Sequence, residues 1–122
     1  MELNKITEKI IGCSIEVHRA LGPGLLESVY EKALCIELDE KGINFEKQKV
    51  LPVNYKNQEI GEFRIDIVVE NSVVVELKSV ERFDPAFESQ ILSYMKLGNY
   101  KIGLLINFNS KLLKQGIKRF VF

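Results

Sequence analysis

The chain has no tryptophan, only one histidine and two cysteines, and no long hydrophobic run. A membrane-spanning helix needs about 20 predominantly apolar residues, so no segment is predicted to cross a membrane. The charged N-terminus does not resemble a secretion signal. Cys13 and Cys35 lack the spacing of metal ligands, which favours free thiols in a reducing compartment. We therefore expect a cytoplasmic protein with a single globular domain over residues 1–122.

Neither sign of charge is in excess, because the formal net charge is zero. That balance disfavours generic binding to nucleic acids. The distribution is uneven, however, because no acidic residue follows Glu88 whereas six basic residues do: Lys96, Lys101, Lys111, Lys114, Lys118 and Arg119. A basic end beside an acidic half can hold a polyanion over a cation. Solvated surface lysines explain the same pattern equally well.

The first third of the chain has the apolar spacing of two helices. The first covers residues 4–20, with Asn4 as a candidate N-cap. The glycines and proline at 22–24 then turn the chain. The second helix covers about residues 25–41, and Gly42 is well placed to end it at the C′ position.

After Gly42 the apolar period changes to that of strands. Ile43–Tyr55 contains Pro52 and predicts one edge strand or two short ones. Glu59–Val69 and Ser72–Ser79 predict two central strands, and their apolar residues on both faces indicate a sheet that is covered on both sides. We expect one face of the first central strand to carry Phe63, Ile65, Ile67 and Val69.

The last third predicts a helix that starts at Asp84-Pro85 and ends near Gly98. Two strands, Tyr100–Phe108 and Ile117–Phe122, follow it, with a short helical turn at 110–115 between them. The helix has the length of a crossover connection, so the strands on either side of it are expected to be parallel. The whole pattern predicts an α/β (α+β) fold with a central mixed sheet flanked by helices.

Three charged residues, Asp66, Glu76 and Lys78, fall inside the two central strands. A buried charge costs several kcal/mol unless it is paired or holds a metal. Two carboxylates can hold a hard divalent cation, and Lys78 shares the face of Glu76, which is suited to metal-assisted phosphodiester hydrolysis. A three-residue loop or a bulge, with Asn71 or Ser72 in the turn, would put Asp66 opposite Glu76. The alternative is a structural ion-pair network with Arg64.

These residues resemble the motifs of the PD-(D/E)XK nuclease superfamily, which has a restriction-endonuclease-like core. The resemblance lies in Glu27 on an early helix, Asp66 on one strand and Glu76-Leu77-Lys78 on the next. Gln90 and Tyr94 look like the Gln-x-x-x-Tyr motif of the RecB-like branch. Gly24, Glu27 and Tyr30 match the signature of the small GxxExxY proteins.

The resemblance implies a role for each residue. Asp66, Glu76 and the backbone carbonyl of Leu77 would bind Mg²⁺, or Mn²⁺ in its place. Glu27 would reach the metal directly or through water, and Lys78 would position or activate the attacking water. Gln90 and Tyr94 share a helix face and would touch the nucleic-acid backbone. His18 and Tyr30 are further candidates for the site.

The sequence thus predicts a metal-dependent nuclease that hydrolyses DNA. The alternative is a catalytically silent module that has kept the fold and binds nucleic acid or a protein partner. A domain of this size offers little groove for a duplex, which favours a homodimer. The residues leave open whether the substrate is DNA or RNA, single- or double-stranded, and cut internally or from an end.

Overall fold

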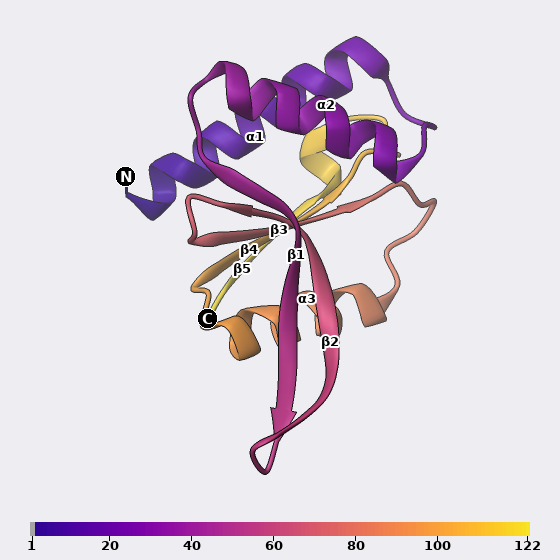
Figure 1. Cartoon of the computed structure of the whole chain (residues 1–122). Coiled ribbons are helices and arrows are strands. Elements are labelled where there is room, and N and C mark those ends of the chain that lie inside the picture. Colours follow the sequence, from indigo (N-terminus) through magenta and orange to yellow (C-terminus); the bar gives the residue numbers. More distant parts are fainter. Residues whose placement is uncertain (1) are drawn as a thin grey trace.

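The computed structural model describes residues 2–122. Its elements are α1 (Leu3–Leu21), α2 (Glu27–Glu40), β1 (Phe45–Tyr55), β2 (Gln58–Val69), β3 (Val73–Lys78), α3 (Pro85–Gly98), β4 (Ile102–Asn107), the 3₁₀ helix η1 (Leu113–Gly116) and β5 (Ile117–Val121) (Figure 1). The five strands form one sheet in the order β1-β2-β3-β4-β5. Only β3 and β4 are parallel, and α3 connects them. The predicted order of elements, the mixed sheet and the parallel pair are confirmed.

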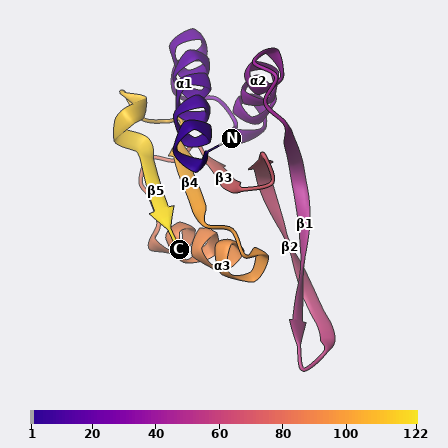
Figure 2. The same ribbon diagram turned by 90° about the vertical axis from the view of Figure 1, so that its left-hand side faces the viewer.

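Helices cover both faces of the sheet, as predicted. Figure 2 shows α1 and α2 side by side on one face and α3 on the other, with the outer part of the β1–β2 hairpin projecting beyond both layers. The larger apolar core lies beneath α1 and α2, and the smaller one lies beneath α3. Strand β3 is buried on both faces from Val73 to Leu77, so any charge on it lies in an apolar environment. Among residues 2–122, no helix is long and apolar enough to span a membrane.

The helix ends show which local signals the sequence carries. Helix α2 ends as expected at Gly42, whose φ of 68° is left-handed, and the amides of Gly42 and Ile43 donate to the carbonyls of Asp39 and Leu38. This is the Schellman arrangement that satisfies the last carbonyls of a helix. The predicted cap at Asn4 is wrong, because α1 already begins at Leu3. The Asn4 Oδ1 atom instead accepts a hydrogen bond from Arg119 Nη2 at 2.8 Å.

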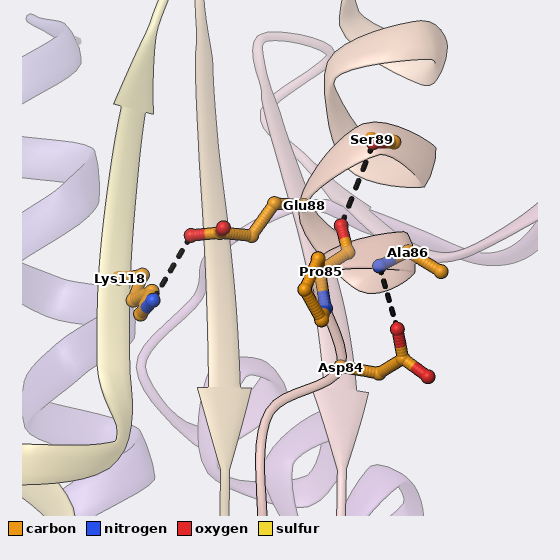
Figure 3. Close-up of polar contacts among 6 residues, drawn as sticks. All are labelled: Asp84, Pro85, Ala86, Glu88, Ser89 and Lys118. Atoms are coloured by element: carbon orange, nitrogen blue, oxygen red, sulfur yellow. Dashed lines mark hydrogen bonds and ion pairs between the residues drawn. The ribbon is translucent and has the colours of Figure 1, made fainter.

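Helix α3 begins as predicted, because Asp84 Oδ1 accepts a hydrogen bond from the Ala86 amide at 2.8 Å, and Pro85 fills the first helical position (Figure 3). It ends at Gly98, as expected, and the following residue Asn99 caps it with a left-handed φ of 58°. Asparagine is one of the few residues that adopt this conformation readily.

The predicted alternation of β2 is wrong at Asp66. Ile65, Ile67 and Val69 were expected to share one face of the strand. Ile67 and Val69 do share a face and belong to the core under α1 and α2, but Ile65 belongs to the core under α3. The irregularity coincides with Gln48 on the neighbouring strand β1, which has a left-handed φ of 52°. Asp66 and Gln48 are absent from the β1–β2 register, between the pairs Lys47–Ile67 and Lys49–Ile65. The alternation of β2 side chains between the two faces of the sheet therefore shifts at Asp66.

A glycine substitution tests the packing after β4. A Cβ atom at Gly116 would meet Ser110 Oγ and lie 2.5 Å from the Asn107 carbonyl oxygen, whereas one at Gly12 in α1 would meet nothing within 4 Å. We expect Gly116→Ala to lower the free energy of unfolding by about 1–3 kcal/mol through overpacking. Gly12→Ala should raise it by about 0.5–1 kcal/mol. Denaturant titration of both variants measures these changes, and equal stabilities would contradict the packing around Gly116.

Candidate active site

The centre of the site is the point where strands β2 and β3 stop pairing. The β2–β3 register ends at the pair Ile67 and Val75. Beyond it, the Asp66 amide donates to Glu76 Oε1 at 3.0 Å, and the Leu77 amide donates to Asp66 Oδ2 at 2.9 Å. Each carboxylate thus replaces a ladder bond by accepting from the opposite strand. The strand ends bring Asp66 and Glu76 together as predicted.

The turn that sets this register is the expected loop at residues 70–72. Glu70 and Asn71 take left-handed φ values of 50° and 52°, and the Ser72 amide donates to the Val69 carbonyl at 3.0 Å. Asn71 or Ser72 was expected to take up the turn, and the left-handed residues are Asn71 and Glu70. A shorter turn would have moved Glu76 to the opposite face.

The carboxylate pair carries an unfavourable concentration of negative charge. Glu76 is only 4% exposed. Burial, together with the negative charge of Asp66, raises the pKa of Glu76 to about 8, and the Asp66 amide and the Lys78 charge oppose that rise only in part. Burial and the same two carboxylates raise the pKa of Tyr94 to about 12. A cation bound between the carboxylates would offset this repulsion.

Lys78 shares the β3 face of Glu76 but forms no ion pair with either carboxylate. Its Nζ atom lies 4.2 Å from the centroid of the Phe87 ring on α3. No salt bridge within residues 2–122 involves Asp66, Glu76, Lys78 or Arg64. The predicted alternative, a structural ion-pair network, therefore does not explain why these charges lie in the strands.

A cavity of about 150 Å³ opens beside Asp66, on the side of α2. It is lined by Glu27, Ser28, Glu31, Gln48, Asp66 and Leu77. Glu27 is the first residue of α2, so the helix start directs it to the same cavity as Asp66. Gln48 Nε2 donates to Glu31 Oε1 at 2.7 Å and lies 3.5 Å from Asp66 Oδ1.

Three of these lining residues, Ser28, Glu31 and Gln48, were not anticipated. Glu31 follows Glu27 by one helical turn, a spacing that places both on one helix face. Gln48 is a polar residue in the strand that pairs with the one containing Asp66. Both signals were present in the sequence, but neither pointed to the cavity without the register of β1.

The oxygen atoms available at this site fit a hard divalent cation. Asp66 and Glu76 supply the carboxylate oxygens that Mg²⁺ and Mn²⁺ prefer, and the buried Glu76 carboxyl lacks a compensating ion pair. Across residues 2–122, no three His, Cys, Asp or Glu side chains are placed to hold one ion together. The arrangement is thus a two-carboxylate site, with Glu27 in the adjoining cavity.

Tyr30 lies in the core rather than on an accessible surface of the site. Its side chain is fully buried and stacks on Phe108 with ring centroids 4.5 Å apart. The Tyr30 hydroxyl donates to the Gly22 carbonyl at 2.6 Å and accepts from the Leu25 amide at 3.0 Å. These two hydrogen bonds therefore fix the loop that precedes Glu27.

The same loop is fastened to the end of β3. Ser79 Oγ donates to the Leu25 carbonyl at 2.6 Å. The buried side chain of Asn107 on β4 accepts from the Val80 amide at 3.1 Å and donates to the Val80 carbonyl at 2.8 Å. Ser79 and Asn107 were not predicted, although an asparagine at the end of an apolar strand is a recognisable signal. Together they fix the segment that follows Lys78 relative to the start of α2.

The remaining predicted residues lie around this centre in different environments. Tyr94 is buried and packs against Phe63 at a centroid distance of 5.1 Å, whereas Gln90, one turn earlier, is exposed. His18 does not line the Glu27–Asp66 cavity. Its Nε2 atom lies 2.7 Å from the Ser110 carbonyl oxygen, and it lines a separate, larger cavity.

The fold, with a buried carboxylate pair at the separation of two central strands, can be compared with known protein families. A family model of the PD-(D/E)XK nuclease superfamily matches residues 4–120. The chain belongs to this superfamily, and its mixed sheet with flanking helices is a restriction-endonuclease-like fold. Membership points to nuclease activity, to interaction with nucleic acid and to use of a divalent metal. Searches of curated proteins and of solved structures give no match.

The raised pKa of Glu76 makes a prediction about stability without metal. A carboxyl whose folded pKa lies above its ordinary value of 4.5 binds its proton more tightly in the folded state. The contribution of the Glu76 carboxyl to the free energy of unfolding should therefore be fully present below about pH 4.5 and should be lost as the pH rises to about 8. We expect Glu76→Gln, which stays neutral and keeps an oxygen acceptor, to remove this decline.

Melting temperatures in chelator, taken from pH 5 to pH 8.5, measure the effect. Each kcal/mol corresponds to roughly 2–8 °C for a domain of this size. The exposed Glu81→Gln serves as the matched control and should follow the native protein. A Glu76→Gln variant with the same pH dependence as the native protein would show that Glu76 titrates normally.

Proposed function

We propose that this protein is a metal-dependent nuclease that hydrolyses phosphodiester bonds in DNA. The observation that carries the proposal is the buried Asp66–Glu76 carboxylate pair at the separation of β2 and β3, in a chain of the PD-(D/E)XK superfamily. Asp66 and Glu76 bind one divalent cation, Mg²⁺ or Mn²⁺ in its place, with the Leu77 carbonyl as an additional oxygen ligand.

The bound cation supplies Lewis-acid polarisation of the scissile phosphate. Lys78 positions or activates the attacking water and stabilises the charge that develops on the phosphate. Its Nζ atom lies over the Phe87 ring, and it leaves this position when an anionic substrate arrives. Glu27 adds an oxygen from the mouth of the cavity that it shares with Asp66.

The exposed Gln90 contacts the nucleic-acid backbone at the α3 border of the site, and a contact by Tyr94 requires its buried side chain to become accessible when substrate binds. They are one turn apart on α3, which packs over the face that carries Glu76. We also propose membership in the GxxExxY group, on Gly24, Glu27 and Tyr30, and in the RecB-like branch, on Gln90 and Tyr94. The free cysteines Cys13 and Cys35 favour a reducing compartment such as the cytoplasm.

A second function has support from the position of Lys78. Its side chain contacts Phe87 rather than the carboxylates, and no third acidic or histidine ligand joins Asp66 and Glu76 among residues 2–122. A module that binds nucleic acid or a protein partner without turnover would tolerate both features. Metal-dependent cleavage distinguishes the two functions.

We also propose that the protein forms a homodimer, because a single domain of this size offers little groove for a nucleic acid.

The test is incubation of purified protein with single- and double-stranded DNA in Mg²⁺ and in Mn²⁺. We expect cleavage by the native protein and none by Asp66→Asn, which keeps the size of the side chain and loses the charge. Lys78→Ala should lower the rate by about 10²-fold or more, because it removes charge stabilisation in the transition state. Its binding of Mn²⁺ should be retained.

The matched control is Lys101→Ala, which removes the exposed lysine directly before β4. It should leave the rate of cleavage unchanged. Cleavage by Lys78→Ala at the native rate would remove the lysine from the mechanism. Equal cleavage by Asp66→Asn would identify a contaminating nuclease and contradict the proposal.

A further inference from the structure

A second cavity among the described residues, larger than the one beside Asp66, lies outside the carboxylate site. It has a volume of about 500 Å³ and lies between the end of α1 and the segment before β5. It is lined by Ile15, His18, Arg19, Lys111, Leu112, Leu113, Lys114 and Gln115, with no acidic residue among them. We call it the basic pocket. Its volume is within the range of pockets that bind small organic molecules.

The charge of the basic pocket comes mainly from two lysines. Lys111 and Lys114 are exposed, and neither forms a salt bridge within residues 2–122. Arg19 is different, because it pairs with Glu16 at 2.8 Å. Lys118, from the same basic end of the chain, is also already engaged, because it pairs with Glu88 at 3.0 Å (Figure 3). The two lysines are therefore available to an anion.

The interior of the basic pocket is apolar. Ile15 is half-buried, Leu113 is buried at the base, and Leu112 is 61% exposed. A phosphate alone would leave such a surface uncovered. The flat apolar face of a base can lie against it while the phosphate of the same nucleotide reaches the lysines, and a basic surface that follows the backbone is one feature of proteins that bind single strands. Bases within a duplex are stacked and cannot enter a cavity of this kind without unstacking.

The basic pocket is also close to the carboxylate site. Asn107 pairs with Lys78 in the β3–β4 register, and Lys111 follows Asn107 by four residues. An extended chain of that length spans at most about 13 Å, and neighbouring strands are about 4.8 Å apart, so the Lys111 Cα lies within about 18 Å of the Lys78 Cα. His18 fixes the intervening segment by its 2.7 Å contact with the Ser110 carbonyl oxygen.

We propose that the basic pocket binds an unpaired nucleotide of a single-stranded nucleic acid whose scissile phosphate lies at Asp66 and Glu76. Lys111 and Lys114 hold the phosphate of that nucleotide, and Ile15 and Leu112 contact its base. The proposal rests on the proposed nuclease function and makes the substrate single-stranded. A separation of at most about 18 Å corresponds to no more than about five phosphate spacings along one strand at duplex spacing, so a short oligonucleotide reaches both sites.

The test measures binding without cleavage, so it does not depend on the nuclease activity. Fluorescently labelled 12-nucleotide single strands of DNA and of RNA, and a DNA duplex of equal length, are titrated in chelator by fluorescence anisotropy. We expect the native protein to bind single strands at least tenfold more tightly than the duplex. The DNA and RNA titrations show which sugar the pocket accepts.

Three variants separate the contributions. Lys111→Ala/Lys114→Ala should weaken single-strand binding at least tenfold and reduce the slope of log K against log salt by about 0.7, the contribution of one phosphate contact on a single strand. Leu112→Ser should reduce the preference for single strands and leave the salt slope unchanged. The control Lys96→Ala/Lys101→Ala removes two exposed lysines outside the pocket and should change binding less than threefold.

Equal weakening by the control and the pocket variant would overturn the proposal, because the effect would then be one of general charge. Duplex binding as tight as single-strand binding would also overturn it. If cleavage fails while the pocket variant still weakens binding, the nuclease function is wrong and the basic pocket stands. If cleavage occurs while the pocket variant binds normally, the nuclease stands and the basic pocket is wrong.

Discussion

The structure depends on the burial of two carboxylates at the end of the β2–β3 ladder. Asp66 and Glu76 accept the amides that the opposite strands would otherwise leave without partners, so they complete the sheet where its regular pairing stops. The same burial raises the pKa of Glu76 to about 8. Asp66 and Glu76 are both needed as acceptors of backbone amides, yet their negative charges repel each other in a buried environment. A bound cation would reduce that repulsion. This conflict is typical of a site kept for function rather than for stability.

The surrounding contacts keep the separated strand ends in place. Tyr30 and Ser79 bind the amide and the carbonyl of Leu25, two residues before Glu27. Asn107 binds both backbone groups of Val80, two residues after Lys78. The start of α2 and the end of β3 are thus joined by hydrogen bonds that do not involve the acidic residues. These bonds restrict the backbone on both sides of the site.

Much of the fold could be predicted because its signals are local. Gly42, Asp84 and Pro85 mark helix ends by their own conformational preferences, and the two-sided apolar run of β3 requires a covered sheet. The loop at 70–72 followed from the need to place Asp66 and Glu76 on one face. Ile65 was assigned to the wrong face because the irregularity at Gln48 arises on the neighbouring strand, and no local pattern in β2 records it.

The site could be predicted only in part, for the same reason. Asp66, Glu76 and Lys78 stand out as charges in apolar strands. Ser79 and Asn107 act through backbone contacts between segments far apart in the chain, and the role of Tyr30 in fastening the Gly22–Leu25 loop depends on where that loop folds. Gln48 acquires its position from the β1–β2 pairing, and Glu31 meets it from α2 by accepting its hydrogen bond. Such residues have ordinary polar side chains, so their type alone does not distinguish them.

The central claim is that Asp66 and Glu76 together hold a divalent cation. The most direct measurement is anomalous diffraction from crystals grown with Mn²⁺. The account predicts a single strong peak between the two carboxylates, at metal–oxygen distances of about 2.0–2.3 Å. It also predicts that the Glu76 side chain turns from the Asp66 amide toward the metal. Full Mn²⁺ loading elsewhere on the chain, with Asp66 and Glu76 still bound only to backbone amides, would contradict the account.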